Sequence, residues 1–96
     1  MNKSSKEAGM AQDVTIFYFA ALREQMGREK ETVPLPAQPV TVEALVTELR
    51  QKDVGMDEVF AASPRIRVAI NQTLATFQDT VKPGDELAFF PPMTGG

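Results

Sequence analysis

Two segments at opposite ends of the chain constrain its fold most strongly. Residues 14–19 are β-branched or aromatic throughout, and residues 87–90 are all apolar. Because successive side chains of a strand point to opposite faces, both faces of each segment are largely apolar, as in a strand covered on both sides. We therefore predict that these first and last strands are central in one sheet. If they are neighbours there, the chain between them is long enough for parallel pairing.

One amphipathic helix is predicted over residues 41–52. Thr41 is a suitable N-cap, and Glu43 is favourable in the first turn. Apolar side chains recur at i, i+3, i+4 and i+7, and these are Val42, Leu45, Val46 and Leu49. Gly55 is expected to end this region, with one further helical turn over 57–62.

The remaining pattern predicts shorter elements around this helix. A short helix over 20–26 is expected to stop at Gly27, and prolines limit 31–35 to a sheet edge or a loop. Residues 65–70 alternate as a strand, with Arg65 and Arg67 facing outward.

Two turns link the last of these elements. Residues 71–73 form a turn that leads to a hairpin partner over 74–77, and Lys82-Pro83-Gly84-Asp85 reads as a β-turn. The fold class is therefore α+β: a mixed sheet of four or five strands packed on the 41–52 helix, ubiquitin-like or β-grasp in outline.

The composition indicates a single small domain without the usual reactive side chains. The 96 residues carry a net charge of −3 and contain neither cysteine nor histidine. Disulfides and thiolate metal sites are thereby excluded, no metal site is predicted, and nucleic-acid binding is disfavoured. No apolar run approaches the ~20 residues of a membrane span, and the polar start lacks the apolar segment of a secretion signal. We expect a cytoplasmic protein.

The predicted domain organisation has three parts. Residues 1–12 form a polar disordered head, in which Met10 is an alternative start; residues 13–90 form the folded domain; and residues 91–96 form a projecting tail. In the tail, Pro91 and Pro92 stiffen the base toward polyproline II. Met93 and Thr94 follow them.

The diglycine Gly95-Gly96 is the candidate reactive site. Glycine has no Cβ, so this tip passes through channels where a larger residue would clash. The terminal carboxylate becomes an electrophile once another enzyme adenylates it. Because the chain has no thiol, any sulfur that it carries must ride on Gly96 as a thiocarboxylate.

Three blocks of sequence resemble the small subunit of molybdopterin synthase. They are FAALRE at 19–24, VAINQTL at 68–74, and GDELAFFPPMTGG at 84–96. The resemblance covers about residues 13–96, and the last block is the most specific. The departures are Met93, where a smaller aliphatic residue is common, and the polar extension before Gln12.

The resemblance implies a β-grasp sulfur carrier of molybdenum cofactor biosynthesis. An E1-like adenylyltransferase would activate Gly96 with ATP and magnesium, neither of which this chain would bind as its own cofactor, and a sulfur donor system would make the thiocarboxylate. The tail, residues 91–96, would then enter the active site of the large synthase subunit. That subunit would supply the catalytic side chains in a heterotetramer of two small and two large subunits. Sulfur would pass to cyclic pyranopterin monophosphate to build the molybdopterin dithiolene.

The other functional interpretations use the same fold. Adenylated Gly96 would also suit a protein modifier attacked by lysine amines, or a sulfur carrier for thiazole synthesis; a β-grasp interaction module with an incidental tail is a third class. Phe90, Arg65 and Arg67 are candidate partner-interface residues, although a core position for Phe90 and a plain solvated surface for the two arginines are the simpler readings.

Overall fold

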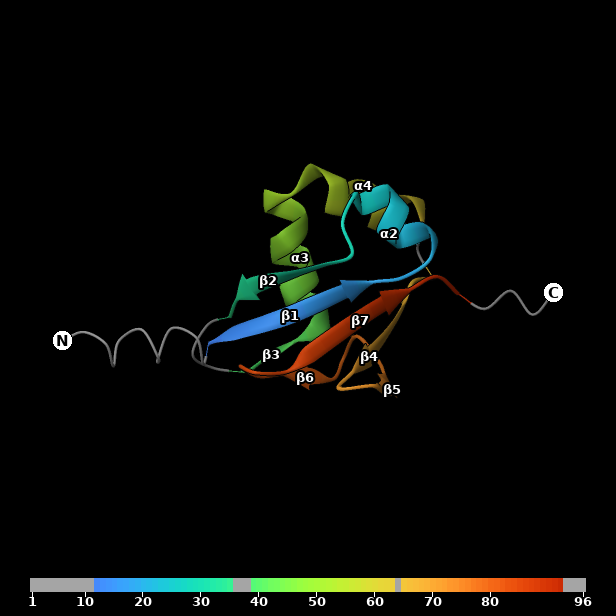
Figure 1. Cartoon of the computed structure of the whole chain (residues 1–96). Helices are drawn as coiled ribbons and strands as arrows, with labels where there is room; N and C mark the ends of the chain where they lie inside the picture. Colours follow the sequence, from blue (N-terminus) through green and yellow to red (C-terminus); the bar gives the residue numbers. More distant parts are fainter. Residues whose placement is uncertain (1–11, 36–38, 64, 93–96) are drawn as a thin grey trace.

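The computed structural model of the chain describes residues 12–35, 39–63 and 65–92. Within these residues, a five-stranded mixed sheet of order β2-β1-β7-β4-β5 forms one layer, and three helices lie on one side of it (Figure 1). The strands of this sheet are β1 (Asp13–Tyr18), β2 (Lys30–Pro34), β4 (Arg67–Ile70), β5 (Thr73–Ala75) and β7 (Glu86–Phe90). The helices are α2 (Ala21–Met26), α3 (Val42–Lys52) and α4 (Val54–Ala62). A second, two-stranded sheet pairs β3 (Val40–Thr41) with β6 (Thr80–Val81). The predicted α+β, β-grasp fold class is confirmed.

The two apolar segments at the ends of the chain are neighbours at the centre of the sheet. β1 and β7 pair in parallel, with Ile16 opposite Leu87 and Tyr18 opposite Phe89. All four side chains are at most 2% exposed and form the middle of the core with the helices. This arrangement confirms the prediction that the first and last strands are central in the sheet. They are neighbours there, and their pairing is parallel.

The predicted start of α3 and the predicted stop of α2 are also confirmed. The Oγ1 of Thr41 accepts a hydrogen bond from the backbone N–H of Ala44 at 3.0 Å, so Thr41 caps α3 as its side chain suggested. Gly27 ends α2 in the left-handed region (φ 75°) and donates its N–H to the carbonyl of Arg23. A side chain at Gly27 would be strained in that conformation.

The turn at the end of β4 is tied to the turn before β7. Asn71 (φ 51°) and Gln72 (φ 70°) form the two-residue connection between β4 and β5, and asparagine tolerates such left-handed backbone better than most residues. The Nδ2 of Asn71 donates to Oδ1 of Asp85 at 3.0 Å, and its Oδ1 accepts from the backbone N–H of Glu86 at 3.0 Å. Asp85 also accepts from the N–H of Lys82, which closes the predicted 82–85 turn.

Two sequence-based expectations are wrong. Gly55 does not end the helical region, because α4 begins at Val54 and Gly55 is in its first turn. Oδ1 of Asp53 accepts from the N–H groups of Gly55 and Met56, and this N-cap starts a new helix directly after α3. The second correction concerns the central strands, whose outer face is not covered by the described part of the chain: Phe17 and Phe90 are half-buried there. The small β3–β6 sheet was not predicted.

Candidate functional site

The root of the C-terminal tail is held by the central strand β7. β7 lies between β1 and β4, and the N–H of Phe19 donates to the carbonyl of Phe89 at 3.1 Å just before the tail begins. Pro91 and Pro92 follow and are half-buried. The other predicted tail residues, Met93, Thr94, Gly95 and Gly96, lie outside the described residues. The fold therefore fixes where the tail leaves the domain.

The sheet face opposite the helices carries an apolar patch beside this root. Paired residues share a face, so the registers Phe17↔Ala88, Arg67↔Phe90 and Ala69↔Leu74 place these side chains on one side. The apolar members form what we call the open-face patch: Phe17, Phe19, Ala69, Leu74, Ala88 and Phe90. Phe19 is 48% exposed and Leu74 is 60% exposed, which is unusual for large apolar side chains that cluster.

A small hollow indents the open-face patch. Its volume is about 130 Å³, and it is lined by Phe17, Phe19, Gln72, Glu86, Leu87 and Ala88. Such a hollow fits one apolar side chain of a partner, the kind of pocket that dominates binding energy at protein interfaces. The patch thus combines exposed apolar side chains with a hollow, the two features expected of a docking surface.

The backbone turn after Phe19 holds that side chain at the end of β1. Ala20 adopts φ 55° and ψ −131°, a region that glycine favours, and the N–H of Leu22 donates to the carbonyl of Phe19 at 3.1 Å. An alanine held there stores local strain. The tight turn directs the chain from the sheet into α2 and leaves the ring of Phe19 exposed.

The two adjacent phenylalanines at the end of β7 have different roles. Phe89 is fully buried: Tyr18 lies 6.3 Å and Phe77 6.2 Å from its ring centroid in stacked arrangements, and Phe60 meets it edge-on at 5.4 Å. Phe90 points to the other face and joins the open-face patch. Of the predicted interface residues, Phe90 therefore lies on the candidate surface. Arg65 and Arg67 are exposed, and Arg67 is in register with Phe90.

A polar network joins β1 to β2 and to the start of α4 on the helix side of the sheet. The hydroxyl of Tyr18 donates to Oε2 of Glu31 at 2.5 Å, and Nη2 of Arg28 bridges Glu31 at 3.0 Å and Asp53 at 2.6 Å. Burial, followed by the hydrogen bond to Glu31, raises the pKa of Tyr18, so this side chain stays neutral. Tyr18, Glu31, Asp53 and Nη2 of Arg28 are paired within the network, whereas the buried Nε of Arg28 has no hydrogen-bond partner among the described residues. We assign the network a structural role.

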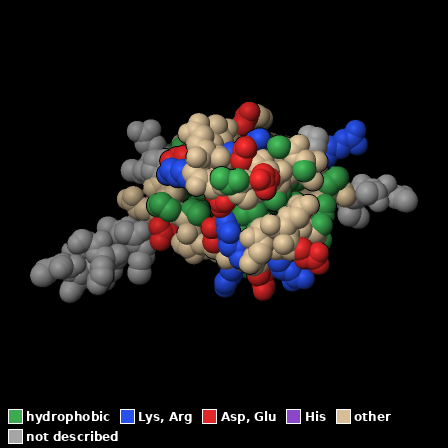
Figure 2. Space-filling view, turned by 90° about the horizontal axis from the view of Figure 1, so that it is seen from above, with side chains coloured by type: hydrophobic (Ala, Val, Ile, Leu, Met, Phe, Trp, Pro, Cys, Tyr) green, Lys and Arg blue, Asp and Glu red, His purple; other side chains and the backbone are tan. Residues whose placement is uncertain are grey.

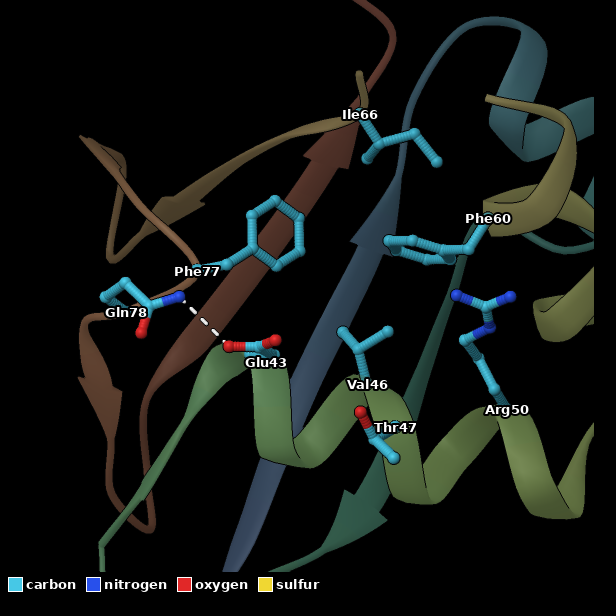
Figure 3. A pocket seen from close by; sticks show the side chains of 8 residues that line it. All are labelled: Glu43, Val46, Thr47, Arg50, Phe60, Ile66, Phe77 and Gln78. Atoms are coloured by element: carbon cyan, nitrogen blue, oxygen red, sulfur yellow. Dashed lines mark hydrogen bonds between the residues drawn. The ribbon is translucent and has the colours of Figure 1, made fainter. Parts of the chain in front are cut away.

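A separate groove lies on the helix side, between α3 and the segment from β5 to β6 (Figure 3). Its volume is about 350 Å³; Phe60 and Phe77 project into it and Glu43, Arg50 and Gln78 stand at its rim. Nε2 of Gln78 donates to Glu43 at 3.0 Å, and Nε of Arg50 pairs with Asp57 at 2.7 Å. The rim charges are thus engaged within the domain.

The described residues contain no group of three or more His, Cys, Asp or Glu side chains that could hold a metal ion. The helix-covered side shows acidic and basic side chains interspersed (Figure 2). None of the helices in this part of the chain is long and apolar enough to cross a membrane. What the geometry offers is a fixed tail root beside a docking surface.

Of the open-face patch, sequence reasoning named only Phe90 as an interface residue, and its two most exposed members, Phe19 and Leu74, are among those missed. The apolar pattern places Phe19 at the end of a covered strand and Leu74 at the start of a hairpin partner. Leu74 carried a signal, because it stands alone as a large apolar residue in the polar stretch from Asn71 to Thr76. Phe19 carried no such signal, because an apolar residue at the end of a strand gives the same sequence pattern whether the chain itself or a partner covers it.

Comparison with known proteins identifies the group to which this architecture belongs. The profile of the ThiS family matches residues 16–96. The chain belongs to the ThiS family. A curated relative of this ThiS-family chain, the molybdopterin synthase sulfur carrier subunit of Haemophilus influenzae, is 40% identical over 84 residues, covering 86% of this chain and 99% of the relative. The subunit of the same name from Escherichia coli is 37% identical over 86 residues, with the same two coverages. These relatives confirm the resemblance read from the sequence.

Solved structures confirm the fold of this ThiS-family chain. SAMP1 from Haloferax volcanii superposes with a TM-score of 0.70 at 26% identity, covering 88% of this chain and 99% of that one. A subunit in the complex of subunits 1 and 2 of the molybdopterin-converting factor from Helicobacter pylori gives a TM-score of 0.57 at 21% identity, covering 88% and 99%.

Proposed function

We propose that this chain is the sulfur carrier subunit of molybdopterin synthase, and that Gly96 is its sulfur attachment point. The observation that carries the proposal is the match of the family to the very end of the chain: the profile extends to Gly96, the last residue of the diglycine. The fold supports it, because the tail begins at the end of a central strand that cannot shift without disrupting the core.

The chemistry proceeds at the carboxylate of Gly96. An oxygen of this carboxylate attacks the α-phosphorus of ATP on an E1-like adenylyltransferase, which uses magnesium, and pyrophosphate leaves. Sulfide-level sulfur from a donor system then attacks the carbonyl carbon. The C–S bond forms as the bond to AMP breaks, and loss of the sulfur's proton leaves a thiocarboxylate in place of the carboxylate. In the synthase the thiocarboxylate sulfur is passed to cyclic pyranopterin monophosphate, and two such transfers build the dithiolene.

The chain's own residues deliver the tail. Gly95 and Gly96 form a tip without side-chain bulk, Met93 and Thr94 extend it, and Pro91 and Pro92 restrict its base, which lowers the entropy lost on insertion. The catalytic side chains belong to the large subunit, because this chain lacks histidine and cysteine. ATP and magnesium are substrates of the activating partner and not resident cofactors of this chain.

The open-face patch is the surface that meets the large subunit. It adjoins the tail root through Phe90, and its exposed members Phe19 and Leu74 gain favourable burial in a complex. The curated relatives are named as subunits of a synthase, and the structurally similar Helicobacter pylori protein is in a two-subunit complex. A heterotetramer of two small and two large subunits is the expected assembly, in the cytoplasm.

A protein-modifier function is the second candidate. One observation favours it: the similar SAMP1 from Haloferax volcanii belongs to proteins described as small archaeal modifiers. There the adenylated Gly96 would be attacked by a lysine amine to give an isopeptide. The relatives of higher identity carry the sulfur-carrier name, which favours sulfur transfer.

Intact mass spectrometry distinguishes these functions. After incubation with the activating enzyme, ATP and a sulfur source, a carrier gains the mass of sulfur in exchange for oxygen at Gly96, whereas a modifier yields lysine-linked conjugates in cell extract. Full activity after deletion of Gly96 would refute both. Adding one residue after Gly96 displaces the carboxylate by about 3.5 Å and should abolish transfer.

A further inference from the structure

Two arginines beside the open-face patch form no ion pair with an acidic side chain of the described residues. In the described part of the chain, ion pairs within 4.0 Å engage four cationic side chains: Arg28, Arg50, Lys52 and Lys82. Arg65 and Arg67 form none, and neither do Arg23 and Lys30. Arg67 is the first residue of β4 and Arg65 precedes it by two positions, and both are exposed. Arg65 and Arg67 differ from the other unpaired cations in lining one hollow together, next to exposed Leu74.

These arginines border a shallow hollow at the β5 edge of the sheet. The hollow has a volume of about 560 Å³, and its apolar lining includes Leu74, Ala75 and Phe77. The lining contains a single carboxylate, that of Asp79, and this group accepts hydrogen bonds from the N–H of Thr76 at 2.9 Å and from its hydroxyl at 3.4 Å. The hollow therefore combines an apolar lining with the guanidinium groups of Arg65 and Arg67, which form no ion pair with Asp79.

The hollow is continuous with the proposed docking surface. Arg67 is in register with Phe90, the last residue of β7, and Leu74 belongs to both the hollow and the open-face patch. A partner that covers the patch and receives the tail must extend over or past this edge. The local positive charge also stands out against the net charge of −3 for the whole chain.

We propose that Arg65 and Arg67 form a cationic docking site for an acidic segment of the large subunit. The proposal rests on the proposed function, because it assumes that the large subunit covers the open-face patch. Each guanidinium presents a planar fork that binds a carboxylate through two hydrogen bonds. At the rim of an apolar interface, such pairs speed up association and fix the orientation of docking. Correct orientation brings the tail root to the entrance of the partner's active site.

Charge reversal tests the site against a matched control. The double variant Arg65→Glu/Arg67→Glu and the control Lys52→Glu/Lys82→Glu change the net charge equally, but the control residues lie at the end of α3 and in the 82–85 turn. Association with the purified large subunit is followed by stopped flow at low and high salt, after circular dichroism has shown that every variant is folded. An Arg65→Ala/Arg67→Ala variant keeps the test valid if the reversal unfolds the domain.

We expect the arginine reversal to slow association about 10-fold or more at low salt, with the difference shrinking at high salt, and the control to change it by less than about 3-fold. Equal association rates for the two double variants would overturn the site. Slowed binding to the adenylyltransferase with normal binding to the large subunit would overturn the choice of partner. At saturating concentrations of the large subunit, sulfur transfer should persist in all variants. If the wild-type protein itself transfers no sulfur, the proposed function is contradicted, whatever the association rates are.

Discussion

Replacing Asp53 with alanine should destabilise the domain by removing two interactions at once. Oδ1 of Asp53 caps α4 by accepting from the N–H groups of Gly55 (2.9 Å) and Met56 (3.3 Å), and loss of such a cap costs about 1 kcal/mol. Oδ2 pairs with Arg28 at 2.6 Å, and since both side chains are about a third exposed, this pair contributes about 0.5 kcal/mol. The expected loss of unfolding free energy is therefore about 1.5 kcal/mol, or a fall in Tm of roughly 6–12 °C for a domain of this size.

The variant Asp53→Asn separates the two contributions. Asparagine is as good an N-cap as aspartate but carries no charge, so only the roughly 0.5 kcal/mol of the ion pair should be lost. Urea denaturation followed by circular dichroism is the suitable assay, because the chain has no tryptophan and one tyrosine. If Asp53→Ala and Asp53→Asn were equally stable, the cap would contribute nothing and the reasoning would fail.

Acid should reduce the difference between the wild-type protein and Asp53→Asn. Burial alone would raise the pKa of Asp53, but the hydrogen bonds from Arg28 and from the N–H of Met56 outweigh it and lower the pKa. A carboxyl group with a lowered pKa adds stability above its unfolded value of about 3.9 and loses that stability as the pH falls through the folded value. The stability gap should thus be full at pH 7 and narrow below about pH 4. A gap that widens in acid would contradict this assignment.

Three further substitutions examine the candidate site. Phe19→Ala should weaken binding to the large subunit by about 1–2 kcal/mol with little change in stability, measured by calorimetric titration, whereas Val54→Ala, at an exposed position on α4, should leave binding unchanged. Phe89→Ala should instead cost about 3–5 kcal/mol of stability, measured in urea, because its ring is fully buried among aromatic neighbours; a loss below 1 kcal/mol would contradict that packing. Ala20→Gly should raise Tm, since glycine adopts φ 55° without strain, and an unchanged or lower Tm would show that no strain is stored there.

The sequence predicted those elements whose signals are local. The Thr41 cap, the Gly27 stop and the outward Arg67 each follow from one residue type in one backbone environment. The α3–α4 junction differs from the prediction. A glycine at position 55 indicates a helix stop when it is considered alone, but Asp53, a good N-cap residue two positions earlier, starts a new helix there. A Cβ at Gly55 would lie 3.3 Å from Oδ1 of Asp53, so glycine here leaves room for the cap.

The β3–β6 sheet escaped prediction for a different reason. Each of its strands has two residues, too few for any alternation to show, and the pairing joins Val40 to Val81 across half of the chain. It forms because the core already brings these segments together: Val81 is fully buried. Non-local pairings of this kind follow from packing and are not encoded in a local pattern.

The apolar character of both faces of β1 and β7 now has a physical explanation. Ile16 and Phe89 are covered by the chain's own helices, whereas Phe17 and Phe90 are only half-buried on the other side. An apolar pattern along a strand indicates that a face is covered, but it does not indicate whether the chain itself or a partner covers it. Under the proposed function, the C-terminal tail enters another protein. A sheet face completed by that protein then links docking to delivery of the tail, because Phe90 on that face directly precedes the tail.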